Sequence, residues 1–369
     1  MTPQHPIGRP WHERQSSGFQ HEDTRDLRLT KRALGGLLLG SVVFLVVGCA
    51  SNAPQDTLDP AGPNAAKELG LFQLVFWVAV AVFVLVQGLV ILALVRFRRR
   101  DGDDGKEPVQ VHGNTRLELG WTVAPALILA VLAVPSVATI FTLARAPDDP
   151  INVTLVARQF WWEYRYTDYK PDLFTANELH IPTGRDIHII EDGTLGNADV
   201  IHSWWVPKLS GKTDNIPGRI NKLTLKADEP GTYLGQCAEF CGLSHANMRL
   251  RVIAEAPEDF DRWVAEQQRA APAPPDPESP EGQGRAVFEA KGCTGCHTVT
   301  GFSKGKVGPD LTHVSSRQTF AGGMFDMNAD NLRRWLQNPP AAKPGARMPD
   351  LDLTQAEITQ LIAYLQTLE

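Results

Sequence analysis

Two short clusters of cysteine, histidine and methionine contain the residue types that could hold redox cofactors. The first cluster is Cys293-Thr294-Gly295-Cys296-His297. Two thiols at this spacing can bond covalently to the two vinyl groups of one haem, and the following imidazole can bind its iron. A zinc site or a thiol–disulfide pair is the alternative, but no second cysteine pair follows in the sequence. The cluster therefore predicts a covalent c-type haem.

The haem iron needs a second axial ligand with a sulfur or nitrogen donor. Four residues in the same region are candidates: Met324, Met327, Met348 and His313. Met348 lies in Arg347-Met348-Pro349, before the last predicted helix, and this position resembles the loop methionine of class I cytochromes c. We therefore predict axial ligation by His297 and Met348.

The second cluster runs from Cys237 to Met248 and combines two thiols, an imidazole and a thioether, all of which bind copper. A mononuclear blue copper needs only one cysteine, so two cysteines indicate thiolates that bridge two coppers. Each copper then needs a nitrogen ligand. His245 supplies one, and His202 can supply the other from a neighbouring strand. A Cys237–Cys241 disulfide and a zinc site are the alternatives.

Two long apolar segments, Leu71–Val95 and Trp121–Leu143, contain no charged residue. The first would be roughly 37 Å long as a helix, enough to cross a hydrocarbon core of about 30 Å. Prolines at 125 and 135 are tolerable in a membrane helix. The segment between the two spans is rich in arginine, so the positive-inside rule places it in the cytoplasm and the rest of the chain after Leu143 outside.

The N-terminal region has basic residues followed by an apolar run, Ala33–Val47, which is too short to span a bilayer comfortably. The run ends in Val47-Gly48-Cys49, which resembles a bacterial lipoprotein signal. We predict a signal peptide over residues 1–48 and a lipid anchor at Cys49. A short uncleaved anchor with a buried cysteine is the alternative. With Cys49 lipidated, all five cysteines have a role without a disulfide.

The exported part changes pattern at about residue 146. Short alternating segments such as 151–156 and 222–225, separated by turn signals, predict an antiparallel sandwich or barrel that a helical stretch, 257–270, closes. A proline-rich linker and a small, mostly helical domain follow. The predicted parts are an exported N-terminal segment (49–66), a transmembrane hairpin (67–145), a β domain (146–270), a linker (271–283) and a helical domain (284–369).

Composition agrees with a folded protein. The 369 residues are 43% hydrophobic and 21% charged, which is ordinary for globular chains. The net charge of −6 argues against a nucleic-acid partner.

The motifs together resemble a known family. Residues from about 65 to 265 resemble subunit II of the haem–copper cytochrome c oxidases, which has a cupredoxin-like Greek-key copper A domain. The matching motifs are His202-Ser203-Trp204, residues 212–219 and residues 235–248. The C-terminal class I cytochrome c domain makes the chain similar to the caa3-type variant. The resemblance implies a dinuclear copper A centre bound by His202, Cys237, Glu239 (through its carbonyl), Cys241, His245 and Met248.

The resemblance also implies roles for four further side chains. Glu239 would reach a magnesium ion shared with subunit I. Phe160 and Trp161 lie in an aromatic strand through which electrons enter copper A. The family commonly has tryptophan at the position of Phe160, so either Trp161 makes the contact or a fused donor makes it less critical; core packing is the alternative. Glu118 would help proton uptake into subunit I, and a simple interfacial charge is its alternative.

The resemblance implies electron transfer from haem c to copper A and on to subunit I, where oxygen reduction and proton translocation would occur. The implied partners are subunit I, the other oxidase subunits, and an upstream cytochrome c or bc1-type complex as donor. The implied location is the bacterial inner membrane. A copper A-type nitric oxide reductase is the main alternative. A free electron carrier, a copper-delivery protein and a quinol oxidase subunit II, which would lack these copper ligands, fit the motifs less well.

Overall fold

The computed structural model describes residues 53–98, 110, 112–195 and 199–369. The predicted signal peptide and the lipid anchor at Cys49 lie outside the described residues, so both stay predictions.

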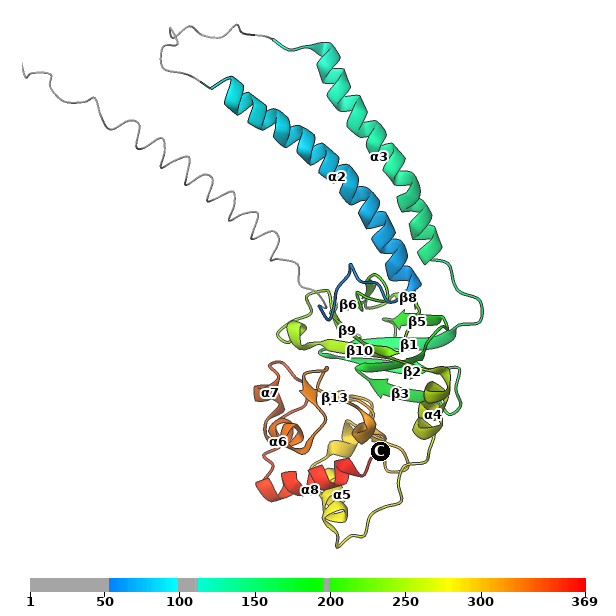
Figure 1. The fold of residues 1–369 in the computed structure, drawn as a ribbon. Helices are drawn as coiled ribbons and strands as arrows, with labels where there is room; N and C mark the ends of the chain where they lie inside the picture. Colours follow the sequence, from blue (N-terminus) through cyan, green and yellow to red (C-terminus); the bar gives the residue numbers. More distant parts are fainter. Residues whose placement is uncertain (1–52, 99–109, 111, 196–198) are drawn as a thin grey trace, which may run out of the picture. The chain divides into compact units, whose positions relative to one another are not determined.

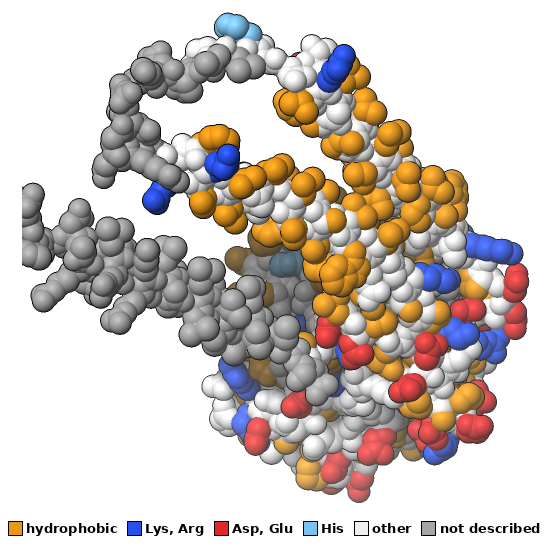
Figure 2. Space-filling model, turned by 45° about the horizontal axis from the view of Figure 1, so that its top comes forward, with side chains coloured by type: hydrophobic (Ala, Val, Ile, Leu, Met, Phe, Trp, Pro, Cys, Tyr) orange, Lys and Arg blue, Asp and Glu red, His pale blue; other side chains and the backbone are white. Residues whose placement is uncertain are grey.

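Two long helices, α2 (Pro63–Arg96) and α3 (Thr115–Leu143), contain the predicted spans and lie side by side (Figure 1). Each begins before its predicted span. Pro63 starts α2 as a first-turn proline, and the Asn114 side chain caps α3 by accepting from the backbone N–H groups of Arg116 and Leu117. Apolar side chains cover both helices (Figure 2), and both are long and apolar enough to cross a membrane.

The β domain consists of two five-stranded sheets. The first sheet has the order β3 (Leu173–Ala176), β2 (Trp161–Tyr166), β1 (Ile151–Arg158), β5 (Ile187–Asp192) and β8 (Ile220–Leu225). The second has the order β4 (Glu178–Pro182), β10 (Arg249–Glu255), β9 (Gly231–Cys237), β6 (His202–Trp205) and β7 (Thr213–Asn215).

Each sheet contains one parallel pair, which the sequence patterns did not predict. β1 pairs in parallel with β5, and β4 pairs in parallel with β10, whereas the other pairs are antiparallel. The chain leaves the first sheet at β4 and returns to it at β5, so β5 runs beside β1 in the same direction. This exchange between sheets confirms the expected cupredoxin-like architecture, and α4 (Pro257–Gln267) packs against β4 and β10.

The core of the β domain is aromatic. The side chains of Trp162, Tyr164 and Trp204 are fully buried, and the Trp204 indole donates to the Tyr164 hydroxyl at 3.0 Å. Trp162 and Tyr164 alternate with outward residues on β2, as a half-buried strand requires. These residues lie beside the strands that end at the second cluster, residues 237–248, which is called the copper-type motif below.

The C-terminal domain is helical, as predicted, and adds two short strand pairs. Its elements are α5 (Pro280–Ala290), α6 (Ala329–Gln337), α7 (Pro339–Ala342), α8 (Gln355–Gln366), β11 (Thr298–Val299) with β12 (Ser303–Lys304), and β13 (Thr319–Phe320) with β14 (Phe325–Asp326). The domain also has two short 3-10 turns, η2 (Cys293–Gly295) and η3 (Val314–Ser316), whereas the 3-10 turn η1 (His245–Asn247) belongs to the β domain.

Helices α5 and α8 pack against each other (Figure 1). They approach closely at Gly284, where an added Cβ would lie 1.9 Å from the carbonyl oxygen of Gln360. The rings of Phe288 and Tyr364 meet edge to face at 5.6 Å across the same contact. Ser279 caps α5 by accepting from the Gly282 backbone, so the helix begins inside the segment predicted as linker.

Candidate copper and haem sites

Strand pairing positions the copper-type motif. Strand β9 ends at Cys237, β10 begins at Arg249, and the Cys237 backbone N–H donates to the Met248 carbonyl at 2.9 Å to close the loop between them. Strand β6 runs beside β9, with Trp204 opposite Cys237. His202, at the start of β6, therefore lies beside the loop although it is far away in sequence.

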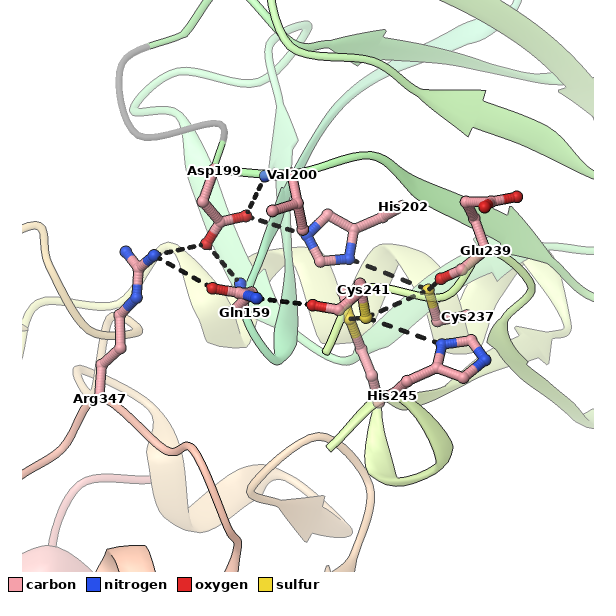
Figure 3. Close-up of polar contacts among 10 residues, drawn as sticks. Gln159, Asp199, Val200, His202, Cys237, Glu239, Cys241, His245 and Arg347 are labelled. Carbon is pink, nitrogen blue, oxygen red and sulfur yellow. Dashed lines mark hydrogen bonds and ion pairs between the residues drawn. The ribbon is translucent and has the colours of Figure 1, made fainter. Parts of the chain in front are cut away.

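The candidate ligand atoms gather around the Cys241 sulfur (Figure 3). Cys241 Sγ lies 3.8 Å from Cys237 Sγ, 3.7 Å from His245 Nδ1 and 3.9 Å from Met248 Sδ. Cys237 Sγ lies 3.9 Å from His202 Nδ1. His202, Cys237, Cys241 and Met248 are all buried. Buried thiol, imidazole and thioether donors that converge in this way suit copper.

Glu239 presents two different groups. Its carbonyl oxygen lies 3.2 Å from Cys237 Sγ, so the backbone can contribute a donor to the same site. Its carboxylate is exposed and points away from the sulfur atoms (Figure 3). The side chain is therefore free to face a group outside this chain.

The pKa values of the two thiols are shifted in opposite directions. Their mutual hydrogen bond lowers the pKa of Cys237 and raises the pKa of Cys241. Burial opposes protonation of His202, but hydrogen bonds to Asp199 and Cys237 outweigh it and raise the pKa of the imidazole. Because a metal binds thiolate and neutral imidazole, copper would have to displace these protons.

Two residues that the sequence analysis did not identify contact the candidate ligands and hold them in place. Asp199 Oδ1 lies 3.0 Å from His202 Nε2, and Asp199 also accepts from the backbone N–H groups of Gln159 and Val200. The Gln159 side chain donates to the Cys241 carbonyl at 2.6 Å. A carboxylate that orients a ligand histidine is a common second partner in metal sites. In the sequence, Asp199 is marked only by its position three residues before His202, and Gln159 is not marked at all.

The haem-type motif opens into a cavity of about 340 Å³ in which the predicted haem ligands meet. Cys293, Cys296, His297 and Met348 all line it, and apolar side chains such as Leu332, Leu361 and Leu365 form much of the rest. Two thiols, an imidazole and a thioether on an apolar cavity have the chemistry that a covalent haem requires.

The surroundings of His297 and Met348 fit axial ligation. His297 Nδ1 lies 2.8 Å from the Pro309 carbonyl, which leaves Nε2 available. Burial lowers the pKa of His297, which favours the neutral ligand form. The Trp335 indole donates to Met348 Sδ at 3.2 Å and so fixes the thioether. Trp335 is a further positioning residue that the sequence analysis missed.

The other axial candidates differ in their placement. Met327 lines the same cavity, whereas Met324 packs against the core of the domain. His313 Nδ1 lies 2.6 Å from the Glu369 carbonyl oxygen and is not among the residues that line the cavity. The geometry therefore favours Met348, with Met327 as the nearest competitor.

The predicted aromatic contact lies between the two sites. Phe160 is buried in the core and Trp161 begins β2, and both line the haem-type cavity. Glu118 lies in the first turn of α3, where its Oε1 accepts from the Asn114 backbone N–H at 3.3 Å. This contact gives Glu118 a capping role in addition to the proton-uptake role that the family resemblance implies.

Comparison with known proteins identifies matches along most of the chain. Family models match residues 50–139 (cytochrome c oxidase subunit II, transmembrane domain), 172–255 (the periplasmic domain of the same subunit) and 282–369 (cytochrome c). The cytochrome c oxidase subunit 2 of Alkalihalophilus pseudofirmus is 37% identical over 93% of this chain and 99% of its own length.

Two other relatives match parts of the chain. The quinol oxidase subunit 2 of Bacillus spizizenii is 37% identical over 65% of this chain and 75% of its own length. A crystal structure of the periplasmic domain of subunit II of cytochrome oxidase from Bradyrhizobium japonicum is 27% identical, with a TM-score of 0.31, and covers 34% of this chain and 97% of that one.

The fold and the two sites define a membrane-anchored electron-transfer subunit with a cupredoxin-like domain and a cytochrome c domain. The chain belongs to the cytochrome c oxidase subunit II family. The enzyme class is cytochrome c oxidase, and the family implies copper A and haem c as cofactors, other oxidase subunits as partners and extracytoplasmic redox domains on a membrane anchor.

Proposed function

We propose that this chain is the electron-input subunit of a caa3-type oxidase, carrying electrons from one covalent haem c to a dinuclear copper A centre and on to subunit I. Bound there, haem and copper supply reversible one-electron chemistry. Cys293 and Cys296 would hold the haem through thioethers, with His297 and Met348 as axial ligands. The copper ligands would be His202, Cys237, Glu239 (carbonyl), Cys241, His245 and Met248.

One observation carries the proposed route: the turn between β1 and β2 contacts both sites. Phe160 and Trp161 line the haem-type cavity. Gln159, the preceding residue, donates through its side chain to the Cys241 carbonyl. Through its backbone, Gln159 also donates to Asp199, which contacts the candidate ligand His202. The two candidate redox sites are thus linked by a few covalent and hydrogen-bonded steps.

The loop that contains most of the copper candidates, residues 237–248, is also suited to electron transfer with little change of geometry. Four of the six candidates (His202, Cys237, Cys241 and Met248) are buried, and β9, β10 and a carboxylate at His202 hold the site. A rigid donor set limits rearrangement when an electron arrives, and two bridging thiolates would share the charge over both metals. These features support electron transfer rather than copper delivery, which requires exposed and exchangeable ligands.

Two finer roles follow from the family and the side-chain positions. The exposed Glu239 carboxylate is free to bind a magnesium ion shared with subunit I. Glu118, at the start of α3, would help proton uptake at the cytoplasmic side. Both roles require subunit I, so each would be tested by substitution to glutamine in the assembled complex.

The proposed function is tested on the purified complex with reduced cytochrome c as donor. We expect oxygen uptake, with rapid reduction of haem c followed by copper A. Nitric oxide turnover without oxygen uptake would instead identify a copper A-type nitric oxide reductase. Metal analysis belongs to the same preparation: one copper per chain, or no mixed-valence copper signal, would contradict the dinuclear site.

A further inference from the structure

A hairpin of the cytochrome domain lies directly against the copper domain. Strands β13 and β14 form this hairpin, and Ala321 and Gly322 in its turn have positive φ angles of 53° and 74°. The Arg249 backbone N–H donates to the Gly322 carbonyl at 2.9 Å. A Cβ added at Gly322 would lie 2.7 Å from the Phe160 carbonyl oxygen and 2.9 Å from that of Asn247. The two backbones therefore touch at this point.

A buried lysine joins the two domains at the same place. Lys343 is 3% exposed, and its Nζ donates to the Phe160 carbonyl at 2.7 Å and to the Ala321 carbonyl at 2.8 Å. Burial lowers the pKa of this amine to about 7. One amine thus fixes the hairpin turn and the turn between β1 and β2 together.

A buried glutamate makes the reciprocal contact. Glu178, the first residue of β4, is 1% exposed. Its carboxylate accepts from the Gln318 backbone N–H at 3.0 Å, from the Thr319 N–H at 2.7 Å and from the Thr319 hydroxyl at 2.7 Å. A buried carboxylate is costly unless donors satisfy it, and these three donors all belong to the cytochrome domain.

The rim of the interface is different. Arg347 NH2 lies 2.9 Å from Asp199 Oδ2, and the arginine side chain is 53% exposed. Exposed ion pairs contribute little and weaken in salt, whereas buried contacts are screened much less. The docking strength must therefore come mainly from the buried contacts, which include those of Lys343 and Glu178 and the hydrogen bond from the Ser244 hydroxyl to the Pro344 carbonyl at 2.6 Å.

We propose that Lys343 and Glu178 form a permanent clamp that keeps the cytochrome domain docked on Phe160 and Trp161, so that external donors reduce the haem and cannot reach the copper site directly. The direction of electron flow in this inference rests on the proposed function, but the clamp itself does not. Phe160 and Trp161 face the cavity of this chain's own cytochrome domain, so a soluble cytochrome has no access to them while the clamp holds.

The clamp is tested by cutting the linker in the assembled complex. A protease site placed at residues 273–276, which are largely exposed, would leave docking as the only link between the domains. After cleavage we expect the c-haem absorbance to stay with the complex on gel filtration, at low salt and in about 1 M salt. Release of the wild-type domain at low salt would refute the clamp, without any interface variant.

Two variants locate the clamp, and one serves as a control. Lys343→Met keeps most of the side-chain volume, and Glu178→Gln keeps the shape while removing the charge. We expect each to lower retention of the cleaved domain at least fivefold, whereas Arg347→Gln at the rim retains it. Full retention in both single variants would show that these residues are not the clamp. The c-haem and copper A spectra before cleavage verify that each domain is folded and loaded.

The second half of the proposal is tested by the order of reduction. Stopped-flow mixing of the wild-type complex with reduced soluble cytochrome c should reduce haem c first and copper A afterwards. After cleavage and release in Lys343→Met, copper A should be reduced directly. Direct reduction of copper A in the intact wild type, ahead of haem c, would overturn the claim that the site is covered. Absent copper or haem would instead contradict the proposed function.

Discussion

The copper-type loop and the haem-type cavity assemble their candidate ligands in opposite ways. Residues 237–248 provide five of the six copper candidates between two paired strands, and their donor atoms already contact one another. The haem candidates come from η2, from the two residues that follow it (Cys296 and His297) and from Met348 much later in the chain, and they surround a cavity of about 340 Å³. The first site depends mainly on local structure, and the second depends on the packing of the whole domain.

This difference predicts opposite consequences of losing the cofactor. The copper domain has its own core of buried aromatic and aliphatic side chains, into which Cys237, Cys241 and Met248 pack. The cytochrome domain surrounds a cavity that its own side chains do not fill. Haem should therefore be part of the core of its domain, whereas copper should be an addition to a domain that is already folded.

The largest expected effect is that of preventing haem attachment. In the double variant Cys293→Ser/Cys296→Ser, an unfilled 340 Å³ cavity would cost at most about 8 kcal/mol at ~24 cal/mol per Å³, comparable to the stability of a whole domain. We expect the amides of α5 and α8 to lose protection in hydrogen exchange. Copper removal from the wild type is the control and should leave the amides of β9 and β10 protected. If losing copper reduced protection as much as losing haem does, the proposed difference between the two domains would be wrong.

The next largest effect concerns the copper site alone. Cys237→Ser replaces a soft bridging ligand by a poor one, and every other donor depends on the same pair of sulfurs. We expect the copper content to fall from two per chain to at most one, with loss of the mixed-valence signal. Elemental analysis and electron paramagnetic resonance measure this. An intact mixed-valence signal would mean that Cys237 is not a bridging ligand.

Loss of one haem ligand should be milder than loss of one copper thiolate. Met348→Leu removes the thioether, but Cys293 and Cys296 would still hold the haem. We expect unchanged haem content and a fall in reduction potential on the order of 100 mV, because methionine ligation raises the potential. Redox titration measures the shift. Met327→Leu is the matched control, and a larger shift in that variant would exchange the two assignments.

A smaller effect is expected from changing a residue that contacts a copper candidate without being a copper candidate itself. Asp199→Asn keeps the shape of the side chain but removes the charge that orients His202. Substitutions of such partners typically weaken metal binding by about 10- to 100-fold. Competition with a copper chelator measures the affinity, and far-ultraviolet circular dichroism checks the fold. Unchanged affinity would show that the strands alone hold His202 in place.

The same contrast explains what the sequence could predict. The copper candidates were identifiable because short spacing and strand pairing bring them together; only His202 required a long-range match. The supporting residues were not identifiable, since Asp199, Gln159 and Trp335 act through contacts that packing creates. Lys343 and Glu178 look like ordinary surface charges in sequence and become buried only where two domains meet. The parallel strand pairs also arise from topology rather than from local alternation.

The smallest expected effect concerns the hydrogen bond that the haem candidate Met348 accepts from Trp335. Trp335→Phe removes the hydrogen bond to Met348 Sδ while keeping an aromatic ring in the core. A neutral hydrogen bond contributes about 0.5–1.5 kcal/mol, which corresponds to roughly 20–60 mV for one electron. Without the donor, the sulfur gives more electron density to ferric iron, so the potential should fall by this amount. A shift as large as that of Met348→Leu would mean that Trp335 holds the ligand itself in place.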